Sequence, residues 1–489
     1  MEISDIKQKA ISGSKWSVIE KFALQLVQFV VGIVLARLLG PKAFGLIALT
    51  SIFLVISGAI MDGGFEKALI QNKFLSDLQV TTAFYINILL GVLLAIVICL
   101  FAPSIARYFD APELTNILRV MSLGLPINAF GQTQRMLLMK ELNFKKISVA
   151  QIFSAVMSGL VGITLAFCGF GVWALVYSSL VSTLTMVLIF WYKSPWYPRL
   201  KFSYASIAPV VPFGLNVLAS GVLFFFLQQF NNFIVGKYYS KTELGLFSRG
   251  MKFPELVASV IQGVVLKISF PLFSKLQDDE THLKSVVRKS NRTVAFIMFP
   301  LLAFLFLDAR QIIVLLLTDE WIGAVVFLKV FCLVKLFEPF ISIQRELLLA
   351  KGRAKLLFRL FILTSVIEVV PILFLVKYDI MYVVWATLFS KVFQYFLYQF
   401  IASGRMRISV SESVGWILPY FLIIIGAGGI VYALDFFVLD PLHTGILLHL
   451  IIDAACGLGL YATALLMFRM EELDTLKIVA RSIFNFRKS

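Results

Sequence analysis

Ionisable side chains interrupt several long apolar stretches of this 489-residue chain. A charge at the centre of a membrane helix costs about 2.5–3.5 kcal/mol on insertion scales, so such a residue is expected to face a protein interior or water. Lys21, Arg119 and Lys391 have no opposite charge three or four positions away. Lys252 also lies within an apolar stretch, and its structural alternative is an ion pair with Glu255 on the same helix face. These four residues are candidate contacts for an anionic ligand inside a membrane protein.

Four acidic residues also lie within apolar stretches: Glu20, Glu338, Glu368 and Asp453. A carboxylate in such a place can exchange a proton or hold a cation, which makes these residues candidates for ion coupling. A structural alternative exists for two of them. Lys335 and Glu338 have the spacing of an ion pair on one helix face, and Glu20 is close enough to the first span's end to reach the membrane surface.

Amide side chains are concentrated in residues 207–235. Amide groups donate and accept hydrogen bonds, as a sugar hydroxyl requires. Asn216, Gln228 and Asn231 in this segment, together with Gln28 in the first apolar stretch, are therefore candidate sugar contacts. The alternative is hydrogen bonding between helices, which is worth about 0.6 kcal/mol on average.

Enzyme motifs are absent from the sequence, and we predict no catalytic residue. The segment GLFSRGMK, residues 245–252, has Met251 at the position where a phosphate-binding loop has its lysine. His282, His443 and His449 are too scattered along the chain to predict a metal site. None of the four cysteines forms a CxxC motif, so neither disulfides nor zinc is expected, and no cofactor is predicted.

The composition indicates a membrane protein, because 60% of the residues are hydrophobic and only 15% are charged, against about 25% charged in soluble domains. Apolar runs of about 17–25 residues can span a bilayer as helices. They predict an all-α polytopic protein with about 14 spans, centred near residues 27, 52, 90, 124, 157, 181, 221, 257, 300, 333, 366, 390, 424 and 456. The net charge of +16 then indicates loops beside an anionic leaflet, not a nucleic-acid-binding surface.

The distribution of Lys and Arg predicts the orientation of these spans. If the N-terminus is cytoplasmic, the loops on that side carry 30 Lys and Arg residues and the opposite loops carry 8. The positive-inside rule therefore favours a cytoplasmic N-terminus, and an even number of spans places the C-terminus on the same side.

Two segments of the chain each have a similar segment further along. Residues 132–146, QTQRMLLMKELNFKK, are similar to residues 342–355, SIQRELLLAKGRAK. Residues 35–48, LARLLGPKAFGLIA, are similar to residues 235–248, VGKYYSKTELGLFS. Both offsets correspond to six spans, and the second places Gly45 on Gly245. The alternative is a chance match between apolar segments.

An internal repeat of six spans predicts two six-helix lobes related by a pseudo-two-fold axis along the membrane normal, plus two C-terminal helices. The predicted parts are residues 1–203 for the N-lobe, 204–405 for the C-lobe, and 406–489 for the last two spans and a cytoplasmic tail.

Four segments together resemble the bacterial polysaccharide transporter family: residues 11–48, 61–73, 134–147 and 270–279. The resemblance extends from about residue 8 to 400 and is weaker over the last two spans. The family includes flippases of lipid-linked oligosaccharides for O-antigen, colanic-acid-type and teichuronic-acid-type polymers. It is part of the multidrug/oligosaccharidyl-lipid/polysaccharide exporter superfamily.

The resemblance implies lobes arranged in a V, with spans one and seven as gates. It implies a sugar repeat unit on undecaprenyl diphosphate as substrate, moved from the cytoplasmic to the outer leaflet by alternating access. The setting would be the bacterial inner membrane, during synthesis of O-antigen or exopolysaccharide. The implied partners are this lipid-linked substrate, membrane lipids, and a polysaccharide polymerase and other assembly proteins.

Two other functions remain open. An ion-coupled multidrug or cation antiporter of the same superfamily would prefer an acidic cavity, whereas the unpaired charges within the spans are basic. A polysaccharide polymerase or ligase would need a sizeable external loop for its catalytic groups, and the longest external segments have only about 15 residues.

Overall fold

The computed structural model describes the backbone of residues 3–61, 69–70, 75–208, 211–406, 408–439, 441, 445–468 and 470. Within these ranges the side chains at 3–22, 207, 211–220, 264–268, 405–406 and 439 are not described. The chain divides into two compact units, residues 1–248 and 249–489. In the described ranges the regular structure is entirely helical, which confirms the all-α prediction.

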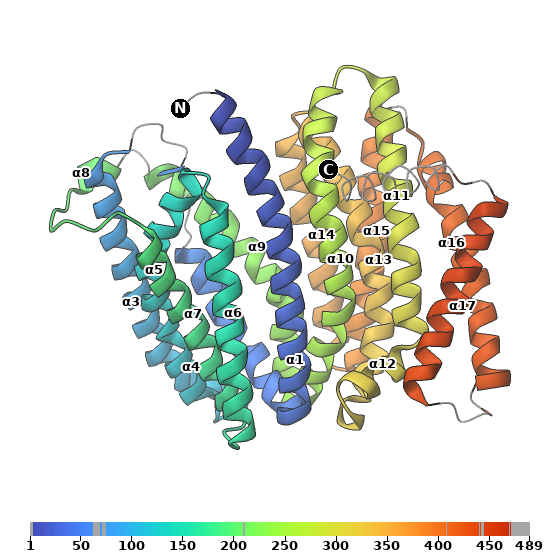
Figure 1. Cartoon of the computed structure of the whole chain (residues 1–489), viewed down its shortest axis with the longest axis horizontal. Coiled ribbons are helices and arrows are strands. Elements are labelled where there is room, and N and C mark those ends of the chain that lie inside the picture. Colours follow the sequence, from blue (N-terminus) through green and yellow to red (C-terminus); the bar gives the residue numbers. More distant parts are fainter. Residues whose placement is uncertain are drawn as a thin grey trace, which may run out of the picture. The chain divides into compact units, whose positions relative to one another are not determined.

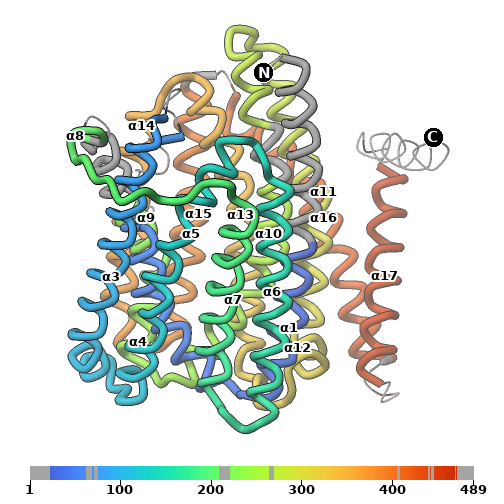
Figure 2. The backbone as a smooth tube through the Cα atoms, turned by 60° about the vertical axis from the view of Figure 1, so that its left-hand side comes forward, coloured from blue at the N-terminus to red at the C-terminus, as the bar shows by residue number. Residues whose placement is uncertain are grey.

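The first unit contains helices α1 to α9 and the start of α10. Their bounds are α1 Ile3–Met61, α3 Asp77–Tyr108, α4 Leu114–Ser122, α5 Gly124–Lys140, α6 Phe144–Phe167, α7 Val172–Lys193, α8 Tyr204–Ile207, α9 Val211–Tyr238 and α10 Lys241–Lys275. Helix α1 packs against α6 and α9, and α5 packs against α3 and α7. Figures 1 and 2 both show α6 and α7 side by side.

The second unit contains the rest of α10 and the helices that follow it. Their bounds are α11 Glu280–Leu307, α12 Ala309–Leu316, η1 Asp319–Trp321, α13 Ala324–Ala350, α14 Ala354–Leu375, α15 Ile380–Met406, α16 Val410–Leu434, η2 Asp435–Leu439 and α17 Ile446–Met467. Helix α13 packs against α11 and α15, and α16 packs against α11 and α17.

Every centre predicted for a span lies within a helix, although the one near residue 124 falls at the first residue of α5. There the helix is interrupted at Leu123, and α4 and α5 replace one continuous span. In the described ranges nine helices are long and apolar enough to cross a membrane on their own composition. Helices α9, α10 and α13 add lengths of 28, 35 and 27 residues. The chain is therefore a multi-pass membrane protein.

Two predicted spans, near residues 27 and 52, belong to α1 and are separated by a sharp kink at Gly40. Gly40 has φ 69° and ψ 173°, a conformation that a residue without Cβ adopts at little cost. Pro41 follows, and proline is favoured at the first position of a helix because its missing N–H would have no partner there. The dipeptide thus ends one helical segment and begins the next.

A close helix crossing lies within the first unit, between the start of the second α1 segment and the start of α10. A Cβ added to Gly45 would lie 1.7 Å from the Lys241 carbonyl oxygen, and one added to Gly245 would lie 1.9 Å from that of Pro41. Each Gly Cα hydrogen therefore points at a carbonyl oxygen of the other helix, a contact typical of small residues between membrane helices. Residues 41 and 241, like 45 and 245, are separated by the repeat offset of 200.

Polar contacts attach α16 and α17 to the rest of the second unit. Arg292 of α11 donates from Nε to the Tyr420 hydroxyl on α16 at 3.1 Å. The Tyr461 hydroxyl on α17 donates to the Phe296 carbonyl of α11 at 3.1 Å. Because lipid is as apolar as these helices, such contacts and close packing hold membrane helices together.

Candidate functional site

A cluster of charged side chains lies on α13, α14 and α15 of the second unit. Lys391 of α15 contacts Glu368 of α14, with 3.1 Å between Nζ and Oε2. The Lys391 ammonium also donates to Gln394 Oε1 at 3.4 Å, and Gln394 Nε2 donates to Thr364 Oγ1 at 3.3 Å. The Lys391 and Glu368 side chains are 19% and 24% exposed, so the pair is accessible from the surface of the unit.

A second ion pair lies on α13. Lys335 Nζ is 2.8 Å from Glu338 Oε1, three residues along the same helix, as the spacing predicts. Glu338 also lies close enough to act electrostatically on the Lys391 ammonium. We name Lys335, Glu338, Glu368 and Lys391 the charged cluster. Its two positive and two negative charges cancel, so a ligand must displace or neutralise a partner to use either lysine.

The sequence could not reveal the partner of Lys391. No opposite charge lies three or four residues from it, which made it a candidate for an unpaired cation, but Glu368 approaches from the neighbouring helix. Residues on different helices meet only through tertiary packing. The expectation that Lys391 is unpaired is therefore wrong, whereas its place in an accessible polar region of the unit remains compatible with ligand binding.

A buried amide chain connects three helices beside this cluster. Gln344 Nε2 of α13 donates to Gln399 Oε1 of α15, and Gln399 Nε2 donates to Ser413 Oγ of α16, both at 2.6 Å. All three residues are buried. Gln344 lies in the repeated segment of residues 342–355, and its spacing in the sequence does not indicate these partners. Its counterpart in the repeat, Gln134 of α5, is buried as well.

The remaining predicted contacts are dispersed over the chain. Gln28, Arg119, Gln228 and Lys252 are exposed, and Asn231 is half-buried. The side chains of Glu20, Lys21 and Asn216 lie outside the described residues. Among the candidates for ion coupling, Glu338 and Glu368 belong to the charged cluster, and Asp453 lies apart from it on α17. The binding roles of all these residues remain predictions.

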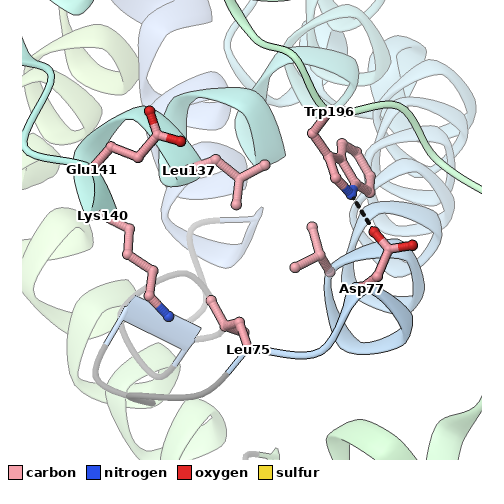
Figure 3. Close-up of a pocket in the computed structure, with 7 residues that line it drawn as sticks. Leu75, Asp77, Leu137, Lys140, Glu141 and Trp196 are labelled. Atoms are coloured by element: carbon pink, nitrogen blue, oxygen red, sulfur yellow. Dashed lines mark hydrogen bonds between the residues drawn. The ribbon is translucent and has the colours of Figure 1, made fainter.

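A shallow pocket of about 290 Å³ lies at one end of the first unit (Figure 3). Asp77, Lys140, Glu141 and Trp196 are among its lining residues. Asp77 Oδ1 accepts a hydrogen bond from Trp196 Nε1 at 2.8 Å, and Asp77 Oδ2 is 3.0 Å from Arg199 Nε. Because Asp77 already has two partners, we interpret this pocket as the place where the segment after α7 is attached to the start of α3.

One protein-family model matches this sequence. The family is described as polysaccharide biosynthesis protein, and the match covers residues 34–326, more than half of the chain. The chain belongs to the polysaccharide biosynthesis protein family. The match includes every helix of the first unit beyond the start of α1, and α10 to the start of α13 in the second.

Two curated members of this group illustrate the similarity. The lipopolysaccharide biosynthesis protein WzxC of Escherichia coli (strain K12) is 26% identical over 360 residues, which are 72% of each chain. The succinoglycan biosynthesis transport protein ExoT of Rhizobium meliloti (strain 1021) is 25% identical over 306 residues, 63% of this chain and 62% of that protein. The resemblance predicted from the quoted segments is confirmed.

A solved structure extends the comparison to the whole fold. The lipid II flippase MurJ, in its inward closed conformation, matches with a TM-score of 0.75 over 95% of this chain and 100% of that chain. The two sequences are only 14% identical, so this match shows the fold and not the substrate. This chain therefore has an all-α transporter fold.

Proposed function

We propose that this protein moves oligosaccharide repeat units linked to undecaprenyl diphosphate from the cytoplasmic to the outer leaflet of the bacterial inner membrane. Membership of the polysaccharide biosynthesis protein family, in a chain with the fold of the lipid II flippase MurJ, is the observation that carries the proposal. ExoT, a relative, is named as a transport protein. The product would serve synthesis of a surface polysaccharide.

A diphosphate cannot cross hydrocarbon alone, because its charges and the attached sugar hydroxyls would lose their hydration. Fixed cations and amides must replace that water during the crossing. The charged cluster supports this role, since it presents Lys391 and Lys335 at partly exposed positions on helices of a membrane unit. Gln394, which hydrogen-bonds to Lys391, adds an amide at the same place.

We propose that the diphosphate competes with Glu368 for Lys391. In the absence of substrate the Glu368 carboxylate compensates the ammonium at 3.1 Å. Protonation of Glu368 would remove that compensation and leave Lys391 free to bind a phosphate oxygen. The same exchange at Glu338 and Lys335 would couple proton uptake to substrate binding at two places. Outward movement of one negative charge along an inside-negative potential would add about 2.3 kcal/mol per 100 mV.

The cationic candidates of the first unit extend the same proposal. Lys21 and Arg119, and Lys252 at the start of the second unit, would add contacts to the diphosphate. Gln28, Asn216, Gln228 and Asn231 would contact the sugars. Both chain termini would be cytoplasmic, in accord with the excess of Lys and Arg in the loops of that side.

Purified protein in proteoliposomes, supplied with a fluorescent undecaprenyl-diphosphate oligosaccharide, tests the proposal. We expect Lys391→Gln to slow transport at least ~10-fold, equivalent to about 1.4 kcal/mol of lost stabilisation. Glu368→Gln should retain substrate binding but shift or remove the pH dependence of transport. The matched control is Lys377→Gln, because Lys377 is an exposed lysine just beyond the end of α14.

A charge swap separates ligand binding from structural support. Lys391→Glu combined with Glu368→Lys keeps an ion pair between α14 and α15 but moves the cation to the other helix. We expect this double variant to be folded and inactive. Transport restored to the wild-type rate would mean that the pair only holds the helices together, which contradicts the proposed contact. Transport of a cationic drug, without transport of the lipid-linked sugar, would instead establish the antiporter.

A further inference from the structure

Three aspartates and a histidine from three separate places in the chain meet at one end of the second unit. Asp308 directly follows α11, Asp435 begins the π-helical turn η2 after α16, and His449 and Asp453 lie one turn apart on α17. One potential ligand atom from each residue lies within 4.8 Å of all the others. We name these four residues the aspartate–histidine cluster.

The imidazole faces two of the three carboxylates. His449 Nε2 is 3.2 Å from Asp435 Oδ1 and 3.1 Å from Asp453 Oδ2. The side-chain nitrogen of Gln311 on α12 lies 3.5 Å from the same imidazole nitrogen. The four residues are separated by up to 145 positions in sequence, so only the fold brings them together.

The carboxylates are buried without enough positive charge. Asp308 is 1% exposed and Asp453 is 2% exposed. Among the described residues, neither carboxylate oxygen of Asp308 accepts a hydrogen bond from a residue outside the cluster, its one side-chain partner is the Asp453 carboxyl group, and one of its oxygens points into the cluster. Lys329 acts on Asp308 only at a distance, and its ammonium lies over the Phe306 ring, 5.5 Å from the ring centre. In the described part of the chain no lysine or arginine forms an ion pair with Asp308 or Asp453.

Burial of several carboxylates around one imidazole is costly unless a cation compensates them. We propose that the aspartate–histidine cluster binds one divalent first-row transition-metal ion, through His449 Nε2 and one oxygen each of Asp308, Asp435 and Asp453. This site is separate from the charged cluster, and the inference does not depend on the proposed transport function.

The donor set and its spacing select this class of ion. Calcium and magnesium prefer sites made only of oxygen, whereas an imidazole nitrogen with carboxylates suits zinc, manganese or iron. Bonds of about 2.0–2.1 Å in a tetrahedral site place neighbouring ligand atoms about 3.3 Å apart. The 3.1 and 3.2 Å separations around His449 already match that geometry, and the remaining separations, which are at most 4.8 Å, must contract by up to about 1.5 Å when the ion binds.

An ion at this place would connect the last two helices with the rest of the unit. His449 and Asp453 belong to α17 and Asp435 to the end of α16, whereas Asp308 lies between α11 and α12. Metal binding should therefore stabilise the attachment of α16 and α17, in addition to the hydrogen bonds of Tyr420 and Tyr461.

Metal binding by the purified full-length protein tests the inference. Protein in detergent is stripped with EDTA, incubated with zinc or manganese chloride, desalted and analysed for bound metal and thermal midpoint. We expect about one retained ion per chain and a higher midpoint with metal. Asp453→Asn and Asp308→Asn should weaken binding at least ~10-fold. Their metal-free midpoints should equal or exceed that of the wild type, because each removes a buried like charge.

The matched control is His282→Ala, since His282 forms a histidine–aspartate pair with Asp279 at 2.7 Å on the exposed surface. It should bind metal like the wild type. If a cluster variant does not fold, pulsed electron paramagnetic resonance of manganese bound to the wild type remains decisive, and ¹⁴N coupling from an imidazole is expected. The inference is overturned if wild-type protein retains no ion, if the two Asp variants retain as much as the wild type, or if ¹⁴N coupling is missing.

Discussion

Alanine at Gly245 tests the close crossing between α1 and α10 directly. The added Cβ would lie 1.9 Å from the Pro41 carbonyl oxygen, and real Cβ contacts are essentially never closer than 3.0 Å. The obstructing atom belongs to the backbone, so no side-chain rotation can relieve the clash. The two helices must separate by roughly 1 Å, which also weakens the packing around the crossing.

The expected loss follows from two opposing effects. Overpacking with a backbone shift costs about 1–3 kcal/mol and occasionally more, while replacing glycine by alanine inside a helix gains about 1 kcal/mol. Since a backbone clash belongs at the upper end of the first range, we expect a net loss of about 2 kcal/mol, or roughly 30-fold in the folded-to-unfolded ratio. Gly45→Ala should cost the same, because its Cβ would lie 1.7 Å from the Lys241 carbonyl oxygen.

Thermal unfolding followed by fluorescence-detected size-exclusion chromatography measures this loss as a lower midpoint. Gly58→Ala is the matched control, because Gly58 lies on the same α1 segment and nothing lies within 4 Å of an added Cβ. It should leave the midpoint unchanged or raise it. The double variant Gly45→Ala, Gly245→Ala should lose less than the sum of the singles, because one separation relieves both clashes. Midpoints for the Gly45 and Gly245 variants equal to that of Gly58→Ala would refute the crossing.

Three further predictions follow from single contacts. Lys42 and Glu113 form an exposed ion pair at 2.9 Å. Exchanging the two residues should change the thermal midpoint of unfolding only slightly, because exposed pairs are worth about 0–1 kcal/mol. A larger fall of the midpoint would show that the pair has a structural role. Gln399→Leu should destabilise the protein by about 1–3 kcal/mol in chemical unfolding, since it leaves two buried partners without hydrogen bonds, and wild-type stability would contradict this. The hydrogen bond from the His282 backbone N–H lowers the pKa of Asp279. Amide hydrogen exchange in the first turn of α11 should therefore accelerate as the pH falls through that pKa, because protonation weakens the helix cap. The Asp279→Asn variant keeps an uncharged cap and should not show this acceleration.

The sequence could predict the helices because apolar runs and their interruptions are local properties. Gly40 and Pro41 interrupt the first long run, and the structure breaks α1 there. The repeat also left a local trace, since Gly45 and Gly245 were matched by sequence and then lie against each other. The interruption at Leu123 was not predicted, although Gly124 and Pro126 follow it and are a local signal for a new helix start.

The partners of buried charges could not be predicted, because they depend on which helices pack together. Glu368 is 23 residues from Lys391, and neither spacing nor composition indicates their contact. The aspartate–histidine cluster was missed for the same reason. Its one local signal was the spacing of His449 and Asp453, four residues apart on one helix face, whereas Asp308 and Asp435 come from distant parts of the chain.

The polar attachment of α16 and α17 has a consequence for biogenesis. These helices are synthesised after α15, and until they are inserted the buried Arg292 side chain lacks its Tyr420 acceptor and Gln399 lacks Ser413. A nascent chain that ends after α15 would therefore keep its apolar helices while exposing unsatisfied polar groups to lipid. Such a chain would be a natural target for membrane quality control, so stop codons introduced directly after the α15 coding region should lower protein abundance more than the loss of mass suggests.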